Sequence, residues 1–406
     1  MISSSLLTTL LLSLAVASTP TVIQDSLVTL PIAKRINANS KATILEHDQA
    51  RAQELRRSHE GRQRDLNPRE NVPAVNGVVD YTVKVQIGSP PTSYTLLVDT
   101  GSSNTWVGAG KPYRNTSTSA PTGQKVSVVY GSGYFDGDEY TDTVNLGSGL
   151  TIKNQSIGVA SSTQGFKDLD GILGIGPVDL TSGTLIDDGS LIPTITDNLF
   201  SQHRIKSNLV SISLSPATSL SSIHGELTFG GIDSSKHKGP IHYAPITSTS
   251  SASAFWGIDQ SIRYGSTTIQ STTAGIVDTG TTLVLLASDI FEQYQNHTGA
   301  VFDSKVGLLR LTKIQYKNLH SLYFHIHGID FELTPNAQIW PRSLNSVIDG
   351  DPDSIYSIIG NLGSNSGQGF DFVNGMTFLE RYYSVYDTTN RRVGLATTSN
   401  TFAETN

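Results

Sequence analysis

The 406-residue chain contains no cysteine, and only 16% of its residues are charged. The absence of cysteine excludes disulfide bonds and thiolate metal sites, and it also removes a clue to the compartment in which the protein works. No apolar run reaches the length of a membrane span, so we expect a soluble product with no membrane partner. Asp and Glu (35 residues) outnumber Lys and Arg (28 residues), which argues against nucleic acid as a partner.

The residues that are abundant favour β structure. The chain has 37 glycines and many Ser and Thr residues, and 37% of it is hydrophobic, which is enough to bury sizeable cores. This mixture suits short strands joined by tight turns better than long helices. Apolar and polar residues alternate from Val79 to Ile87, a Gly-Ser-Pro-Pro turn follows, and a second apolar run ends at Val98. The sequence therefore predicts a mainly β protein.

The first residues have the pattern of a secretory signal. A leucine-rich stretch lies within residues 1–17, and Ala15-Val16-Ala17 fits the small-residue site at which such signals are cut. We therefore expect a secreted, extracellular protein. Asn-X-Ser/Thr sequences, which can carry glycans in secreted proteins, begin at Asn115, Asn154 and Asn296.

Two short motifs of the same kind dominate the chain. Val98-Asp99-Thr100-Gly101-Ser102-Ser103 and Val277-Asp278-Thr279-Gly280-Thr281-Thr282 each follow an apolar run, so each Asp should lie where a buried strand turns. Two carboxylates buried against each other cannot both ionise, and one of them then keeps a proton. Such a pair offers a general base and a general acid at one point.

These Asp-Thr-Gly-Ser/Thr motifs, 179 residues apart, resemble the active-site loops of the pepsin-like aspartic endopeptidases, and the resemblance covers the rest of the chain. It implies a bilobal, mainly β fold with two pseudo-symmetric β-barrel-like lobes and a cleft between them. It also implies that a water held between Asp99 and Asp278 attacks a peptide bond, with no metal or cofactor. The expected substrate is a polypeptide with hydrophobic residues around the cut, and we expect a monomer.

The resemblance gives supporting roles to six residues beside the aspartates: Thr100, Gly101, Ser102, Thr279, Gly280 and Thr281. The glycines allow a tight backbone approach, and the hydroxyl group after each glycine can hydrogen-bond the carboxylate. The threonine before each glycine is where the two loops of the family clasp each other. Buried polar groups in both loops thereby gain partners.

A flap over the substrate is the next feature that the resemblance implies. It corresponds to two strands around the turn at Tyr130, Gly131, Ser132 and Gly133, which would exclude water and position the scissile bond. Trp106 is expected to support the flap tyrosine, because a buried indole N–H needs an acceptor.

Residues 18–70 form an Arg-rich segment with nine Lys and Arg against seven Asp and Glu. The resemblance implies an inhibitory prosegment, with a strand at Leu30–Arg35, and the stretch from Ala42 to His59 is compatible with a helix. Ion pairs between such a segment and an acidic body vanish once the carboxylates protonate. We therefore expect acid-triggered release, followed by cleavage near Asn71.

The catalytic body is expected to divide into an N-terminal lobe at residues 71–240 and a C-terminal lobe at residues 241–406. In the first lobe, Asp170-Gly171-Ile172-Leu173-Gly174 matches the apolar strand that packs behind the first loop. In the second lobe, Ile358-Ile359-Gly360 and Val373-Asn374-Gly375 compete for the equivalent place. We expect the latter, because Tyr382-Tyr383-Ser384-Val385-Tyr386-Asp387 then falls in the register of the family.

Two weaker patterns could indicate metal sites. His325 and His327 are spaced like ligands on one face of a strand, but no third ligand is near in sequence, so we interpret them as a structural pair. The Asp-Gly-Asp-Pro-Asp sequence at residues 349–353 resembles a calcium loop, but its proline and the missing distal Glu favour an acidic surface turn.

Other functions fit the sequence less well. Asp-Thr-Gly also occurs in subtilisin-like serine proteases, but their His-Gly-Thr-His and Gly-Thr-Ser-Met motifs are missing from this chain. A glycoside hydrolase uses paired carboxylates without needing two copies of one motif. A scaffold that only binds peptides usually loses one motif, and here both are intact. The sequence therefore predicts an aspartic endopeptidase made as an acid-activated zymogen.

Overall fold

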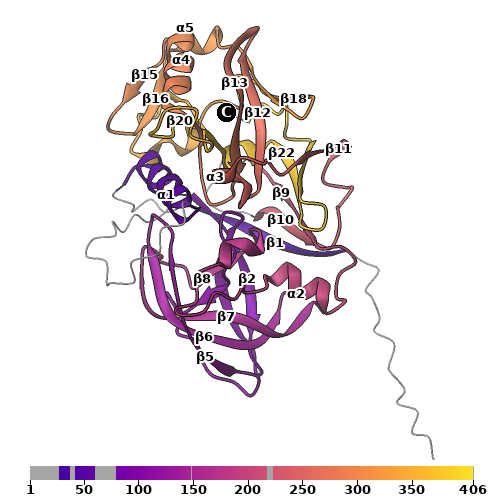
Figure 1. Cartoon of the computed structure of the whole chain (residues 1–406). Coiled ribbons are helices and arrows are strands. Elements are labelled where there is room, and N and C mark those ends of the chain that lie inside the picture. The colour runs from indigo at the N-terminus through magenta and orange to yellow at the C-terminus, as the bar shows by residue number, and fades with distance from the viewer. Residues whose placement is uncertain (1–26, 37–41, 60–78, 148, 217–222, 406) are drawn as a thin grey trace, which may run out of the picture.

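The computed structural model describes residues 27–36, 42–59, 79–147, 149–216 and 223–405. The predicted signal at residues 1–17 and the expected cleavage region near Asn71 lie outside these ranges. Figure 1 shows two lobes, one above the other, with the indigo N-terminal elements running between them. Strands far outnumber helices, so the prediction of a mainly β protein is confirmed.

Short turns join most of the strands, as the Gly-rich and Ser/Thr-rich sequence predicts. The strands of the first half are β1 (Val28–Ile36), β2 (Val79–Ile87), β3 (Thr92–Asp99), β4 (Trp106–Val107), β5 (Ala120–Val129), β6 (Tyr134–Asn145), β7 (Thr151–Gln164), β8 (Gly171–Gly174), β9 (Leu209–Leu214) and β10 (Ile223–Phe229). The strands of the second half are β11 (Lys238–Pro245), β12 (Gly257–Tyr264), β13 (Thr267–Val277), β14 (Val284–Leu286), β15 (Val301–Asp303), β16 (Leu308–Leu311), β17 (Leu322–Ile326), β18 (Ile329–Leu333), β19 (Ile355–Tyr356), β20 (Ile359–Asn361), β21 (Phe372–Asn374), β22 (Tyr382–Asp387) and β23 (Arg392–Thr397). The helices are α1 (Ile44–His59), η1 (Val178–Thr181), α2 (Ile195–Ser201), α3 (Ser250–Ser253), α4 (Ser288–Thr298), α5 (Lys313–Lys317), η2 (Arg342–Ile348) and α6 (Met376–Leu379).

The largest sheet joins both halves of the chain. Its strand order is β11-β23-β22-β9-β10-β1-β2-β3-β8-β4-β7-β6-β5, so strands from the C-terminal end lie beside strands of the first lobe. A second sheet, β18-β17-β12-β13-β21-β14-β20, belongs to the C-terminal half, and β15, β16 and β19 form a small third sheet. The strand β11 runs across the expected lobe boundary at residues 240 and 241.

The expected prosegment contributes a strand and a helix to this architecture. β1, which contains the strand predicted at Leu30–Arg35, lies between β10 and β2 and is antiparallel to both. The stretch that was compatible with a helix forms α1. Val28, Leu30 and Ile32 of β1 and Ile44 of α1 are buried within the main hydrophobic core. Since burying a large apolar side chain contributes about 1.5–3 kcal/mol, both elements are integral to the fold.

The two lobes repeat one arrangement of four strands around their Asp motifs. In the first lobe, β3 is parallel to β8, β8 is antiparallel to β4, and β4 is parallel to β7. In the second lobe, β13, β21, β14 and β20 have the same relations in the same order. The strand that packs behind Asp278 is therefore β21, which confirms the choice of Val373-Asn374-Gly375 over Ile358-Ile359-Gly360.

A polar partner explains why an asparagine is tolerated in this buried strand. The Asn374 side chain donates from Nδ2 to Gln260 Oε1 at 2.8 Å, and both residues are fully buried. A buried amide without a partner would be costly, so Gln260 on the neighbouring β12 compensates for it. None of the helices in the described ranges is long and apolar enough to cross a membrane.

Candidate active site

The two Asp motifs form matching turns at the ends of β3 and β13. The Asp99 carboxylate accepts hydrogen bonds from the Gly101 N–H at 2.9 Å and from Ser102 Oγ at 2.5 Å. The Asp278 carboxylate is held in the same way by the N–H of the glycine two residues on, at 3.0 Å, and by Thr281 Oγ1, at 2.7 Å. Both aspartates are completely buried. Each carboxylate is thus fixed in place by its own loop.

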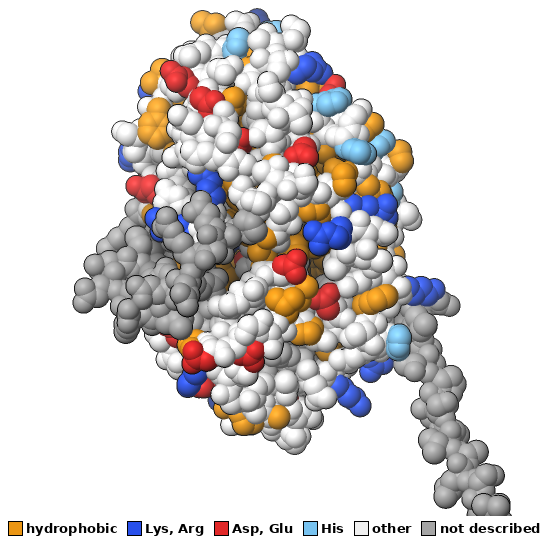
Figure 2. All heavy atoms as spheres, in the orientation of Figure 1, with side chains coloured by type: hydrophobic (Ala, Val, Ile, Leu, Met, Phe, Trp, Pro, Cys, Tyr) orange, Lys and Arg blue, Asp and Glu red, His pale blue; other side chains and the backbone are white. Residues whose placement is uncertain are grey.

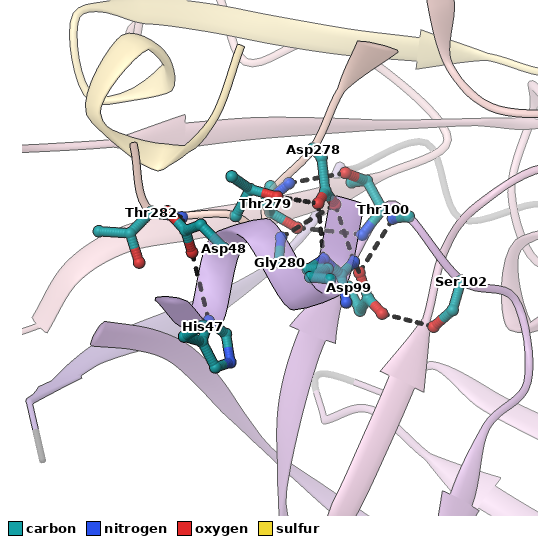
Figure 3. Close-up of polar contacts among 12 residues, drawn as sticks. His47, Asp48, Asp99, Thr100, Ser102, Asp278, Thr279, Gly280 and Thr282 are labelled. Carbon is teal, nitrogen blue, oxygen red and sulfur yellow. Dashed lines mark hydrogen bonds and ion pairs between the residues drawn. The ribbon is translucent and has the colours of Figure 1, made fainter. Parts of the chain in front are cut away.

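Thr100 and Thr279 tie the two loops together. The Thr100 N–H donates to Thr279 Oγ1 at 3.0 Å, and the Thr279 N–H donates to Thr100 Oγ1 at 2.9 Å. The Thr279 hydroxyl in turn donates to the Val98 carbonyl at 3.0 Å. Figure 3 shows these contacts beside Asp99 and Asp278, which come from different lobes and lie close together. The reciprocal bonds satisfy N–H groups that would otherwise be buried without partners.

A single arginine of the expected prosegment binds both carboxylates. Arg51 on α1 places Nη2 2.5 Å from Asp99 Oδ1 and 3.0 Å from Asp278 Oδ1, and its Nε lies 2.8 Å from Asp278 Oδ2. Its side chain is only 3% exposed. A Cβ atom at Gly101 or Gly280 would collide with this guanidinium, so the close approach requires glycine in both loops.

These charges displace the pKa values of the two aspartates in opposite directions. Burial raises the pKa of Asp99 by more than the Arg51 charge lowers it, and Asp278 adds to the increase. Burial also acts on Asp278, but the charge and hydrogen bond of Arg51 lower the pKa of that carboxyl overall. For Arg51, burial disfavours the cation, yet the two carboxylates raise its pKa above the ordinary value. These opposite shifts arise with Arg51 in contact with both carboxylates, so they belong to the arrangement in which α1 covers the pair.

The hairpin of β5 and β6 carries the expected flap residues. Its turn is closed by the Tyr130 N–H, which donates to the Gly133 carbonyl at 2.8 Å. The Tyr130 ring packs edge-on against Phe166 with centroids 5.4 Å apart, and it lies 6.4 Å from the Trp106 ring. The Trp106 N–H has no hydrogen-bond partner among the described residues. The expected hydrogen bond is therefore replaced by ring packing, which includes stacking of Trp106 on Phe135.

Helix α1 lies against the flap as well as against the two aspartates. Gly131 has a φ of +74°, and a Cβ atom at this position would collide with the Ala50 carbonyl oxygen of α1. Ser132 beside it is buried. Ala50 and Arg51 of the helix therefore lie between the turn at Gly131 and the two Asp loops.

A second charged residue of α1, Asp48, also contacts the C-terminal lobe. The Asp48 carboxylate accepts hydrogen bonds from the Thr282 N–H at 3.1 Å and from the Leu283 N–H at 2.8 Å. His47 Nδ1 lies 3.2 Å from Asp48 Oδ1 (Figure 3). Asp48 and Arg51 are three residues apart, so they share one face of the helix.

From the sequence, Arg51 was only one of nine basic residues in residues 18–70, and Asp48 was not singled out. The available signal was their spacing on a stretch compatible with a helix. That spacing places them on one face, but it does not tell which face of the helix meets the Asp motifs. The contact depends on how α1 crosses the body, which is set by packing between residues far apart in sequence.

The other sequence signals lie away from these loops. The three predicted glycan acceptors, Asn115, Asn154 and Asn296, are exposed. His325 pairs with Asp330, with Nδ1 and Oδ1 2.8 Å apart. In the described part of the chain, His, Asp and Glu side chains nowhere form a group of three or more that could hold a metal ion. On the face in Figure 2, described basic and acidic side chains are interspersed, and no continuous basic patch is visible.

The comparisons with known proteins agree on one family. The family described as "Eukaryotic aspartyl protease" matches residues 80–398. The chain is 66% identical over 338 residues to polyporopepsin from Irpex lacteus, covering 83% of this chain and 99% of that protein. It is 30% identical to pepsin-2B from Gadus morhua, covering 78% and 95% of the two chains. The crystal structure of aspartic proteinase from Irpex lacteus superposes with a TM-score of 0.79 at 66% identity, covering 80% of this chain and 96% of that one.

Proposed function

The chain belongs to the eukaryotic aspartyl protease family and is a pepsin-like aspartic endopeptidase, and on this premise we propose that Asp99 and Asp278 are its catalytic pair. A water bound between the two carboxylates attacks the peptide carbonyl. The ionised aspartate takes the proton of this water, and the protonated one stabilises the oxyanion. The proton then passes to the leaving nitrogen. Gly101, Ser102 and their counterparts around Asp278 hold the carboxylates in position for these transfers.

One observation carries this proposal: a single guanidinium group binds both carboxylates at once. Because Nη2 of Arg51 is within hydrogen-bond distance of Asp99 and Asp278, a water in the same place would have the same two partners. The site can therefore hold one small polar group jointly, which is the geometry that water activation needs.

The same contact supports a zymogen in which residues 18–70 inhibit the enzyme. Arg51 occupies the position of the attacking water, and α1 fills the space next to the flap. Further contacts hold this segment: Lys34 Nζ lies 2.5 Å from Glu380 Oε1, and Arg35 Nη2 lies 2.7 Å from Asp80 Oδ2. Arg51 lowers the pKa of Asp278, so this ion pair stabilises the closed arrangement at higher pH and is lost as the pH falls and Asp278 protonates. Acid therefore favours release.

Other observations support the location and the substrate. The signal-like residues 1–17 and the exposure of Asn115, Asn154 and Asn296 support a secreted, glycosylated enzyme. The preference for hydrophobic residues around the scissile bond is proposed from the resemblance of the chain to the pepsin-like enzymes.

Replacement of either aspartate tests the catalytic proposal. Asp99→Asn and Asp278→Asn should each lower the cleavage rate of a denatured protein at acid pH by at least about 10³-fold, because neither an acid–base pair nor a shared proton remains. Asp353→Asn, in an exposed turn, is the matched control. A statine-type peptide should abolish the activity of the wild-type chain. Activity within tenfold of wild type in either Asn variant, or inhibition by a serine-directed phosphonate instead, would contradict the mechanism.

A further inference from the structure

A buried carboxylate of α1 lies outside the catalytic pair. Asp48 is 0% exposed, and both of its oxygens accept hydrogen bonds from backbone N–H groups of the C-terminal lobe. These N–H groups belong to Thr282 and Leu283, which follow the Asp278 turn and precede β14. Asp48 lies beyond the first turn of α1, so its carboxylate does not cap its own helix.

The surroundings of Asp48 have the properties of a built carboxylate site. A buried carboxylate is costly unless it is hydrogen-bonded, and N–H groups that point at one acceptor supply charge-assisted bonds. The Thr282 and Leu283 N–H groups both donate to Asp48. On the helix itself, His47 Nδ1 lies 3.2 Å from Asp48 Oδ1.

We infer that the N–H groups of Thr282 and Leu283 form a carboxylate-binding site and that Asp48, bound there, is a positioning residue for inhibition. The inference rests on the proposed role of residues 18–70 as an inhibitory prosegment. Gln49 and Arg56 also bind α1 to the C-terminal lobe, because Gln49 Nε2 donates to the Asn361 carbonyl and Arg56 Nη2 to the Phe370 carbonyl, each at 2.7 Å. The Asp48 contact differs from these in its place: it lies three residues from Arg51, is opposite to it in charge, and bonds directly after the Asp278 turn. It therefore holds the guanidinium on both aspartates.

The test uses the full chain near neutral pH, before any cleavage, and measures how tightly a statine-type peptide binds to the active site. Binding requires the helix to move away, so the apparent dissociation constant increases as the open fraction falls. Asp48→Asn keeps the size of the side chain but loses its charge and turns a donor toward the two N–H groups. We expect this variant to bind the peptide about tenfold more tightly than wild type, or better.

A charge-matched control lies on the same helix. Glu46 accepts hydrogen bonds from Thr43 at the start of α1 and is exposed. Glu46→Gln removes one negative charge and retains this capping contact, so it should bind the peptide as weakly as wild type. After acid activation and removal of the prosegment, all three chains should bind it equally, because the mature enzymes are then identical.

The outcomes separate the inference from the proposed function. Equal affinity of Asp48→Asn, Glu46→Gln and wild type before activation would overturn the role of Asp48. Failure of the wild-type chain to bind the peptide even after acid treatment would overturn the proposed function instead. If Asp48→Asn does not fold, Asp48→Ser serves in its place, with equal affinity after activation as the check of an intact body.

Discussion

A buried glutamate in the N-terminal lobe predicts how stability depends on pH. Glu139 on β6 is 3% exposed, and its Oε1 accepts a hydrogen bond from Ser156 Oγ at 2.6 Å. Its Oε2 has no hydrogen-bond partner among the described residues. Burial raises the pKa of this carboxyl from 4.5 to about 7, although the bond from Ser156 opposes the increase. The folded chain therefore keeps a proton that the unfolded chain has already lost.

The direction and size of the effect follow from this difference. A carboxyl whose pKa is higher in the folded state stabilises the fold fully below pH 4.5, and this contribution is lost as the pH rises toward 7. The complete loss corresponds to about 3 kcal/mol. Between pH 5.5 and pH 7.5 the expected part is about 2 kcal/mol.

Glu139→Gln should remove this dependence, because the amide does not ionise and can still accept the bond from Ser156. Urea unfolding of the full chain at pH 5.5 and pH 7.5 measures the change. The free energy of unfolding of the variant should fall by about 2 kcal/mol less than that of wild type over this range. Asp138→Asn, half-exposed on the same strand, is the control and should behave like wild type. Equal losses in Glu139→Gln and wild type would refute the reasoning.

Two further predictions concern the prosegment and the contact between the loops. Arg51→Lys should shift acid activation to higher pH, because an ammonium group lacks the planar fork that binds both carboxylates. Arg51→Gln should shift it further, because an amide also lacks the charge. The measurement is the pH at which half of the chain is processed in a fixed time, and an unchanged pH in both variants would contradict the prediction. Thr100→Val should lower the free energy of unfolding by about 1–3 kcal/mol, because it leaves the buried Thr279 N–H without its acceptor. Thr95→Val, in the strand β3 that leads into this turn, is the control in urea unfolding, and an equal effect of both substitutions would argue against the special role of Thr100.

Features encoded by local sequence were predictable. The positions of Asp99 and Asp278 follow from an apolar run ending in a turn, and the flap hairpin follows from alternating residues around Gly131. Even the strand behind Asp278 could be chosen, because the tyrosine-rich stretch after Val373 keeps a fixed spacing from it. In each case the deciding residues are neighbours along the chain.

Features that depend on how distant elements pack were not predictable. Gln260 stabilises Asn374 across 114 positions, and Arg51 binds Asp278 across 227 positions. Alternation along β6 places Glu139 on the same face as Phe135, but the local sequence does not show that one oxygen of its carboxyl is buried without a partner among the described residues. Because Trp106 was expected to be buried, its N–H was expected to have a hydrogen-bond acceptor. The rings that pack around it provide none among the described residues.

The place of β1 has a consequence for maturation. It is an interior strand of the largest sheet. Removal of residues 18–70 would therefore leave one edge of β10 and one edge of β2 without the backbone hydrogen bonds that β1 provides. Exposed strand edges invite new pairing. If residues 18–70 are removed as proposed, the sheet must therefore rearrange where its two halves meet, and the processed enzyme would differ there from the unprocessed chain by more than the loss of these residues.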